Sequence, residues 1–260
     1  MCVCLCPRTK KNDVIYINKE IIEEINSETK EKPQKGTFSL DSSKIPNIQV
    51  IFENQFLKII NKPYNFPVQK SKKDEIALDE IIKSQYTPKE KSLSFVPGPL
   101  HRLDKKTTGL LAFSNNLVGA KEFSNILQNH KVRKTYFTIL EGELAENQFW
   151  KDSINTVDKK DFNNFKIVSV NSKIDTKSNK KNAITEVFPI KTGLYQNKKI
   201  TFAKIIIHTG RTHQIRSQCS YHGFPLLGDI AYNKNSEKIS KDVDFFLHCY
   251  SLTFLETNIL

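Results

Sequence analysis

The stretch Gly98–Gly109, GPLHRLDKKTTG, lies near the middle of the 260-residue chain and continues into the apolar run Leu110–Phe113, LLAF. Proline and glycine at its ends predict a loop, and the apolar run predicts a buried strand. Within the loop, the carboxylate of Asp104 follows two residues after the guanidinium of Arg102. This pattern predicts a loop that presents a reactive carboxylate at the start of a strand. An ordinary ion pair within the loop is the alternative.

Arginine is scarce in this sequence, which makes each arginine informative. Lysine and arginine together number 40, and only five of them are arginine. A chain that uses lysine for nearly every positive charge is expected to keep arginine for positions that need planar, bidentate or stacking contacts. Four of the five lie in three separate motif-like stretches: Arg102, Arg133, Arg211 and Arg216.

The composition predicts one large domain, or one domain with a small appendage. Apolar residues make up 38% of the chain and include 17 Phe, enough for a proper hydrophobic core. The net charge is +12 and the isoelectric point is about 9.3. A charge of this size favours a polyanionic partner such as nucleic acid. A solvated, lysine-rich surface is the alternative explanation.

The sequence predicts a protein of the reducing cytoplasm that does not span a membrane. No apolar run approaches the roughly 20 residues that a spanning helix needs. The apolar start Met1–Pro7 has no preceding basic segment and is too short for a signal-peptide core. The five cysteines are an odd number, which does not suggest a disulfide framework. The spacing of Cys2, Cys4 and Cys6 lacks the paired pattern of zinc ligands.

The chain is predicted to divide near Asn47. Residues 1–47 are expected to form an N-terminal extension with some strand character at Asp13–Asn18, followed by a polar linker with Pro33, Gly36 and Pro46. Residues 48–260 are expected to form the main domain. Its hydrophobic patterns predict more strands than helices, with several strands joined by short turns. This favours an α+β fold, with a mixed, largely antiparallel central sheet and flanking helices.

Individual elements follow from apolar periodicity. A hairpin is expected over residues 50–60, and helices over 74–85, 115–127 and 211–221. Ser114 or Asn115 is expected to cap the second helix, and Leu117 to lie on its apolar face. Further strands are expected at 109–113, 135–140, 165–170, 183–190, 200–207 and 245–250. Within 135–140, alternate residues share a face: Tyr136, Thr138 and Leu140.

Five stretches of the main domain occur in an order and spacing that match a known family. His101–Asp104 (HRLD) with Thr107–Gly109 (TTG) is similar to the signature loop HRLD-x-x-TSG of the RluA-type pseudouridine synthases. Lys134–Tyr136 (KTY) resembles the second motif of that family, and Gly210–Arg216 (GRTHQIR) resembles the third. Asn61–Pro63 (NKP) and Gly223–Asp229 (GFPLLGD) resemble two further segments of these enzymes. The resemblance runs from about Ile48 to the C-terminus, and it implies the pseudouridine synthase fold and a catalytic domain over 48–260.

The resemblance implies isomerisation of uridine to pseudouridine in RNA. The uracil is detached at N1 and rejoined to the ribose through C5, with no redox step or net hydrolysis, so no cofactor is expected. By resemblance, Asp104 is the carboxylate that acts on the sugar, either as nucleophile at C1′ or as base at C2′. Arg216 is its charged partner, and Tyr136 stacks on the uracil, which is flipped out of the folded RNA.

The resemblance also implies supporting roles around this chemistry. Arg102 is expected to hold the opened base stack. Phosphate contacts or RNA binding are expected from the basic residues Lys62, Arg133, Lys134 and Arg211, although Lys62 and Arg211 could instead brace the loop. Support of the loops is expected from His101, Thr108, Gly109 and Gly210. The substrate is expected to be ribosomal RNA of the large subunit, and the protein a monomer.

Other interpretations concern the substrate, the activity, the N-terminal extension and metal binding. The substrate could be transfer RNA, or the chain could be a non-catalytic RNA-binding or ribosome-assembly protein on the same fold. Residues 1–47 could be a remnant of a ribosomal-protein-like RNA-binding domain that often precedes this fold. A metal site could use four histidines, but they lie on different predicted elements without paired spacing, so no metal is expected: His101, His208, His213 and His222.

Overall fold

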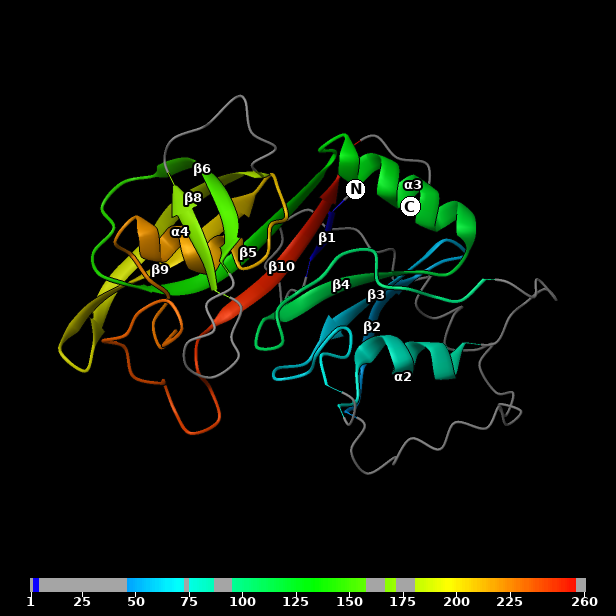
Figure 1. The fold of residues 1–260 in the computed structure, drawn as a ribbon, viewed down its shortest axis with the longest axis horizontal. Coiled ribbons are helices and arrows are strands. Elements are labelled where there is room, and N and C mark those ends of the chain that lie inside the picture. The colour runs from blue at the N-terminus through cyan, green and yellow to red at the C-terminus, as the bar shows by residue number, and fades with distance from the viewer. Residues whose placement is uncertain are drawn as a thin grey trace, which may run out of the picture.

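Figure 1 shows a computed structural model of the protein, which describes residues 2–4, 46–72, 75–86, 95–157, 167–171 and 181–255. The strand character predicted at Asp13–Asn18 and most of the N-terminal extension lie outside the described residues. The helices are α2 (Leu78–Gln85), α3 (Leu117–Gln128) and α4 (Gln214–Tyr221). The strands are β1 (Cys2–Cys4), β2 (Gln49–Glu53), β3 (Leu57–Lys62), β4 (Thr108–Ser114), β5 (Val132–Glu141), β6 (Gln148–Val157), β7 (Ile167–Asn171), β8 (Lys181–Tyr195), β9 (Lys198–Ile207) and β10 (Leu247–Phe254).

The strands form one sheet in the order β2-β3-β4-β10-β5-β9-β8-β6-β7, with β1 paired to β10 outside this path. Among the described strands, the β10–β4 pairing is parallel and the others are antiparallel. The mixed, largely antiparallel α+β fold predicted from the sequence is therefore confirmed. The last strand, β10, is inserted between β4 and β5 near the middle of the sheet.

The predicted hairpins have clear local causes. In the β2–β3 turn, the side-chain oxygen of Asn54 accepts hydrogen bonds from the backbone N–H groups of Phe56 and Leu57 (2.9 and 2.8 Å). Between β8 and β9, Gln196 and Asn197 both have positive φ angles (48° and 62°). Two such residues suit a tight hairpin turn between twisted strands. Both hairpins are therefore encoded close to their turns.

Two predicted details are wrong. The residue that caps α3 is Asn116, whose side chain accepts a hydrogen bond from Gly119 N–H, rather than Ser114 or Asn115. The helix therefore starts later, and Leu117 in its first turn is exposed rather than buried. Strand β6 was not expected at all. Its inward side chains include a buried polar residue, Asp152, which obscures the alternation of apolar residues.

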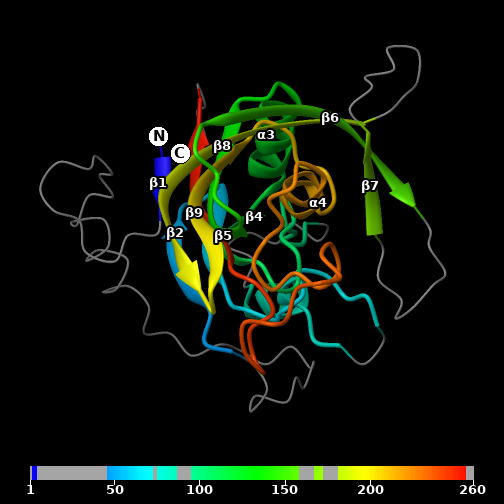
Figure 2. The same ribbon diagram turned by 90° about the vertical axis from the view of Figure 1, so that its left-hand side faces the viewer.

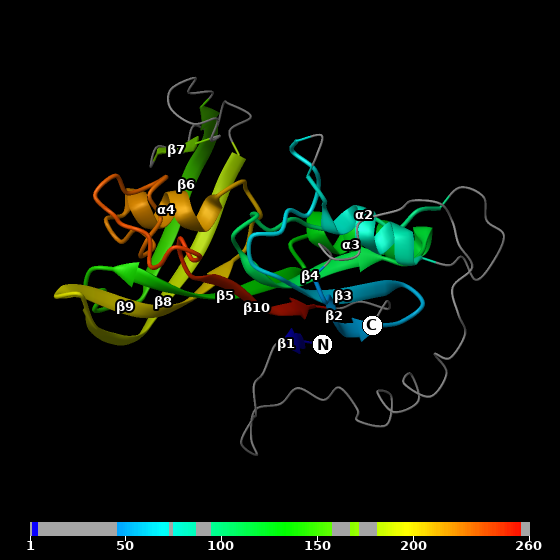
Figure 3. The ribbon, with the colours of Figure 1, turned by 90° about the horizontal axis from the view of Figure 1, so that it is seen from below.

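The three helices of the described residues lie on the same side of the sheet (Figure 3). Helices α2 and α3 lie near β2, β3 and β4, whereas α4 packs against β6 and β7 at the other end, where the sheet bends around it (Figures 2 and 3). The hydrophobic core is concentrated between these helices and the sheet. No helix in the described part of the chain is both long and apolar enough to cross a membrane.

The central loop folds back along β4. Leu100 N–H donates to Ala112 O (2.8 Å), and Ser114 N–H donates to Gly98 O (3.0 Å). Along the loop, His101 and Leu103 are buried, while Arg102 is exposed and Asp104 is half-buried. This alternation anchors the loop through one set of side chains and leaves the other set available to a ligand. The loop is therefore held at both ends by a central strand.

Gly109 joins this loop to the centre of the sheet at a position that only glycine fits. Its φ is +106°, and it pairs with Cys249 in the parallel β4–β10 ladder. A Cβ atom at this position would lie 2.2 Å from the backbone oxygen of Cys249. Both the backbone angle and the close approach of β10 therefore exclude a side chain.

We expect Gly109→Ala to destabilise the protein by at least about 2 kcal/mol, because positive-φ strain adds to displacement of β10. Gly193→Ala is the matched control, since a Cβ there would meet no atom within 4 Å. Urea unfolding of both variants measures the difference. Equal stability of the two variants would contradict the assigned packing of β4 on β10.

Candidate active site

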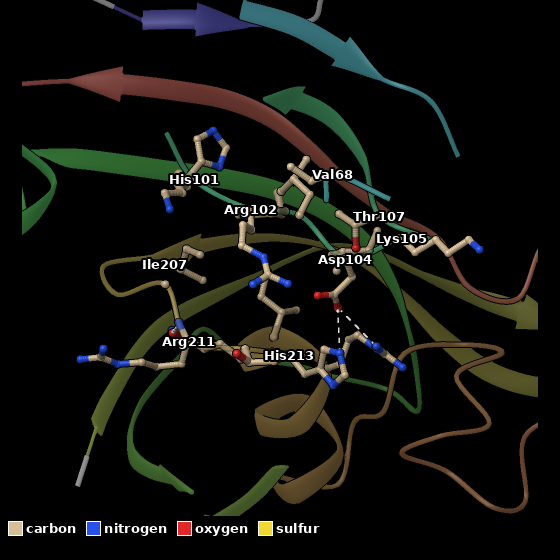
Figure 4. A pocket seen from close by; sticks show the side chains of 18 of the residues that line it. Val68, His101, Arg102, Asp104, Lys105, Thr107, Ile207, Arg211 and His213 are labelled. Atoms are coloured by element: carbon tan, nitrogen blue, oxygen red, sulfur yellow. Dashed lines mark hydrogen bonds and ion pairs between the residues drawn. The ribbon is translucent and has the colours of Figure 1, made fainter. Parts of the chain in front are cut away.

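A pocket of about 1500 Å³ opens beside the central loop. Its lining comes from parts of the chain that are far apart in sequence: residues 99–107, Lys134 and Tyr136 of β5, residues 207–216, residues 229–231, and Asp244, Phe245 and Leu247. Figure 4 shows side chains from several of these segments pointing toward one another. The sheet supplies one wall, and the loops between strands supply the others.

Asp104 lies in this pocket with its carboxylate facing two cationic or polar groups. Its Oδ2 atom is 3.3 Å from Arg216 Nη1 and 3.8 Å from His213 Nε2. Figure 4 shows the interaction between Asp104 and His213 across the pocket. The Asp104 side chain keeps 26% of its surface exposed. The ion pair between Asp104 and Arg216, which the sequence placed 112 residues apart, is present in the structure.

Arg216 binds a second carboxylate more tightly than it binds Asp104. Its Nε and Nη2 atoms donate to the two oxygens of the buried Asp229, at 2.6 and 2.8 Å. Its guanidinium also lies over the rings of Tyr232 (5.0 Å) and Phe245 (4.7 Å). Burial alone lowers the pKa of Arg216, but Asp229 and Asp104 outweigh that effect and raise it, so Arg216 remains charged.

Tyr136 places its ring in the pocket wall and is 4% exposed. It lies opposite Cys249 on the neighbouring strand β10. Burial, followed by the neighbouring Cys249 thiol, raises the pKa of Tyr136 well above its ordinary value. Burial also raises the pKa of Cys249, to about 12. The phenol therefore stays protonated at neutral pH and presents a neutral aromatic surface.

The basic residues at the start of β5 separate onto the two faces of the sheet. Lys134 lines the pocket and is 6% exposed, and burial lowers its pKa. Arg133 precedes it in the strand and is exposed on the opposite face, because successive strand side chains alternate. Arg133 therefore does not line the pocket, and its expected contact with RNA stays a prediction. Only Lys134 of the pair reaches the pocket.

Lys62 has the second of its two expected roles, bracing the central loop rather than contacting phosphate. It is completely buried, and its ammonium group donates to the backbone oxygens of Pro63 (2.9 Å) and Lys105 (2.8 Å). It therefore braces the central loop from inside, the alternative to a phosphate contact. Burial lowers its pKa to about 7, although the nearby Asp104 carboxylate partly opposes the shift.

The predicted loop-supporting residues occupy different kinds of position. Ala112 N–H donates to His101 Nε2 (3.2 Å), and Thr108 Oγ1 shares a hydrogen bond with His248 Nδ1 (2.7 Å). Gly210 has no unusual φ; it leaves room for Lys134, whose Nζ would lie 3.3 Å from an added Cβ. The left-handed residue that starts α4 is instead His213, with φ 52°.

The two remaining arginines point in different directions. Figure 4 shows the Arg102 side chain extending from the central loop into the pocket, between Asp104 and the opposite wall. The guanidinium of Arg211 turns away from Asp104, and its Nε donates to the backbone oxygen of Asn182 at the start of β8 (3.1 Å). The exposed Arg102 therefore faces the pocket from the loop that carries Asp104, while Arg211 is partly committed to the start of β8.

The histidines considered for a metal site are engaged separately. His222 pairs with Asp152 (2.9 Å), His208 pairs with Glu186, and His101 accepts a hydrogen bond from β4. Among the residues that the structure describes, no three His, Cys, Asp or Glu side chains form a group that could hold a metal.

Three residues next to Asp104 and Arg216 were given no role in the predicted active site: His213, Tyr232 and Phe245. Asp229 was also missed, although it ends the GFPLLGD segment.

A family model described as RNA pseudouridylate synthase matches residues 57–221, more than half of the chain. The chain belongs to this family and is an isomerase of that class. An uncharacterized RNA pseudouridine synthase of Haemophilus influenzae is 31% identical, over 80% of this chain and 82% of the relative. Another from Aquifex aeolicus is 26% identical, over 90% of this chain and 73% of the relative. Ribosomal large subunit pseudouridine synthase C of Rickettsia conorii is 29% identical, over 96% and 77%.

Solved structures share the fold. Human RNA Pseudouridylate Synthase Domain Containing 1 superposes with a TM-score of 0.62 at 18% identity, covering 82% of this chain and 91% of that one. Human RNA Pseudouridylate Synthase Domain Containing 4 gives 0.60 at 17% identity, covering 81% and 89%. At this level of identity the likeness concerns the fold alone.

We expect Asp229→Asn to destabilise the protein by about 3 kcal/mol or more, because it leaves the buried Arg216 guanidinium without its main counter-ion. Asp104→Asn removes one longer, partly exposed contact and should cost no more than about 1.5 kcal/mol. Chemical unfolding of the two variants compares them directly. A larger loss with Asp104→Asn would reverse the assigned roles of the two carboxylates.

Lys62 predicts a pH dependence of stability. The pKa of Lys62 is about 7 in the folded protein, against an ordinary value of 10.5 for the unfolded chain. Between these two pH values, the unfolded chain holds the Lys62 proton and the folded chain releases it. Stability therefore rises with pH in this window and is independent of this group below it. The free energy of unfolding of wild type minus that of Lys62→Met should increase by up to about 1.4 kcal/mol per pH unit. A constant difference from pH 7 to 10 would contradict the lowered pKa.

Proposed function

We propose that this enzyme converts uridine to pseudouridine in large-subunit ribosomal RNA, with Asp104 as the carboxylate that acts on the ribose. The observation that carries the proposal is the position of Asp104. Its carboxylate faces a pocket large enough for a nucleotide, 3.3 Å from the permanently charged Arg216. Enclosed ligand sites commonly have volumes of about 300–1000 Å³, so this pocket admits a nucleoside and part of its neighbours.

The reaction places few demands on the protein beyond this carboxylate. The bond from ribose C1′ to uracil N1 breaks, the detached uracil turns, and C5 bonds to C1′ as its proton is lost. Asp104 either attacks C1′, forming an ester that is later displaced, or removes the C2′ proton. In both routes the carboxylate must start ionised, which the charge of Arg216 favours. Tyr136 offers its ring to the uracil while it turns.

Access to the pocket requires the uridine to leave its base stack. Flipping a base out of folded RNA costs a few kcal/mol, which the protein has to offset with new contacts. Arg102 is exposed, extends into the pocket and lies on the same loop as Asp104 (Figure 4). A planar guanidinium can stack on the bases that the uridine leaves behind. We assign Arg102 this role, and Lys134 and Arg211 a role in binding the displaced nucleotide.

Two considerations favour ribosomal RNA over transfer RNA. Relatives that cover most of the chain are named ribosomal large subunit pseudouridine synthase C, at 28–29% identity. The net charge of +12 also suits a large, dense polyanion. We place the enzyme with that RNA in the cytoplasm. Because one chain supplies every residue assigned here, we propose that a monomer is active and that 48–260 is the catalytic domain.

The proposal is tested by incubating the purified protein with total RNA from its own source, without added metal, and mapping pseudouridine by sequencing. Wild type should introduce pseudouridine at one or a few positions of large-subunit RNA, and Asp104→Asn should introduce none while still binding RNA. Asp242→Asn, at an exposed aspartate, is the matched control and should behave as wild type.

Each other outcome has a defined meaning. Modification of transfer RNA alone would replace the substrate but keep the chemistry. Activity retained in Asp104→Asn would overturn the assignment of the carboxylate. Binding without modification by wild type would support the non-catalytic alternative instead.

A further inference from the structure

We propose that Tyr232 and His213 form a positioning pair that holds an imidazole N–H toward Oδ2 of Asp104, leaving Oδ1 to face the ribose. This inference rests on the proposed function, because it assigns Asp104 the reaction with the sugar. The observations that carry it are a chain of three contacts. It runs from a backbone N–H of β7, through Tyr232 and His213, to Asp104.

The first contact determines the direction of the second. The backbone N–H of Val168 donates to the hydroxyl oxygen of Tyr232 (3.2 Å). A backbone N–H can only donate, so the Tyr232 oxygen is an acceptor here and its own proton is available to another group. That group is Nδ1 of His213, 2.8 Å from the same oxygen. We therefore assign this proton to the contact with His213, so that Tyr232 donates to Nδ1.

This direction selects one tautomer of the imidazole. An Nδ1 atom that accepts a hydrogen bond carries no proton, so in neutral His213 the proton is on Nε2. Nε2 is the atom that faces Asp104, 3.8 Å from Oδ2. This separation is longer than a hydrogen bond, and such contacts are often long before substrate binds and shorten in the complex. The pair thus aims a donor at the carboxylate.

His213 remains neutral in its surroundings. Burial lowers the pKa of His213, and the positive charge of Arg216 lowers it further, while Asp104 and Asp229 oppose both effects. These charged groups, with the Tyr232 hydroxyl, face the imidazole from the central loop, from α4 and from residues 229–232. The selected tautomer is consequently the form present at neutral pH.

The backbone of His213 shows that its position is constrained. Its φ of 52° lies in the left-handed region, which costs energy for a residue other than glycine. The ring meets Tyr232 edge-on, with centroids 5.8 Å apart and planes at 90°. Such a conformation persists only where surrounding contacts enforce it. The contact with Tyr232 is one of them, and it aims the imidazole at the carboxylate.

Both neighbours of Asp104 approach the same oxygen. Arg216 Nη1 and His213 Nε2 are each closest to Oδ2. Once the His213 contact shortens in the substrate complex, two donors on one oxygen fix the rotation of the carboxylate and leave Oδ1 for the substrate. Arg216 is already bound to both oxygens of Asp229, so a single bond to Asp104 cannot by itself set that rotation. The imidazole supplies the second point of attachment.

The tautomer can be tested without measuring activity. In ¹⁵N-histidine-labelled protein at pH 7.5, His213, assigned by its absence from His213→Gln, should show an unprotonated Nδ1 and a protonated Nε2. Tyr232→Phe should shift this toward a mixture of tautomers. A protonated Nδ1 in wild type would overturn the proposal, as would an unchanged tautomer in Tyr232→Phe.

Kinetics then test the role. On an RNA that wild type modifies, Tyr232→Phe and His213→Leu should lower kcat by roughly 10- to 100-fold, the range for loss of a hydrogen bond to a charged group. KM and RNA affinity should change less than about threefold, a difference of under 1 kcal/mol. His213→Gln, which keeps an N–H donor, should retain most of the activity. Tyr221→Phe, at an exposed tyrosine of α4, is the matched control.

A pH series separates positioning from loss of structure. As the pH falls below the lowered pKa of His213, protonation restores a proton to Nε2 in Tyr232→Phe, so its deficit relative to wild type should shrink toward low pH. His213→Leu should show no such recovery. An equal deficit of Tyr232→Phe at every pH, or wild-type kcat in both variants, would overturn the proposal. Inactive wild-type protein would instead refute the proposed function, and the tautomer measurement would still decide this inference.

Discussion

The buried guanidinium of Arg216 is the charge on which the pocket depends. A buried cation is costly unless it is paired and hydrogen-bonded, and here Asp229 takes two of its donors and two aromatic rings cover its faces. Of the donors that remain, one on Nη1 is directed at Asp104. The protein therefore uses one buried carboxylate to hold the arginine and leaves a second, partly exposed one facing the pocket. This division explains how Asp104 can pair with Arg216 and still be open to a ligand.

The arginine reaches Asp104 because the sheet order brings distant segments together. Strand β10 enters between β4 and β5, so the loop before β4, the pocket face of β5 and the segment before β10 meet at one place. Helix α4 approaches from the other end of the sheet, where β6 and β7 bend around it (Figure 2). The close contact of Gly109 with Cys249 keeps the loop and β10 in register. Sheet topology thus supplies the geometry that no single motif contains.

The basic residues of the motifs serve different purposes although their charges are alike. Lys62 is enclosed and binds loop carbonyls, Lys134 lies in the pocket wall, and Arg133 lies on the far face of the sheet. Arg102 extends from the central loop into the pocket. Neither the charge of these residues nor the motif to which each belongs could predict from sequence which of these positions it occupies. Strand alternation could have separated Arg133 from Lys134, since Tyr136 was already assigned to the face that Lys134 shares.

The sequence by itself determined the class of fold, the hairpins, and the central loop with the carboxylate that it presents, because periodicity, turn residues and motif spacing are local properties. It also paired Asp104 with Arg216, through resemblance. Only the tertiary structure revealed that Asp229 is the main partner of Arg216, that Lys62 is internal, and that Tyr232 and His213 lead to Asp104. Those contacts join residues from separate loops and strands. Their burial and direction depend on how β10, α4 and β7 pack, which no local pattern encodes.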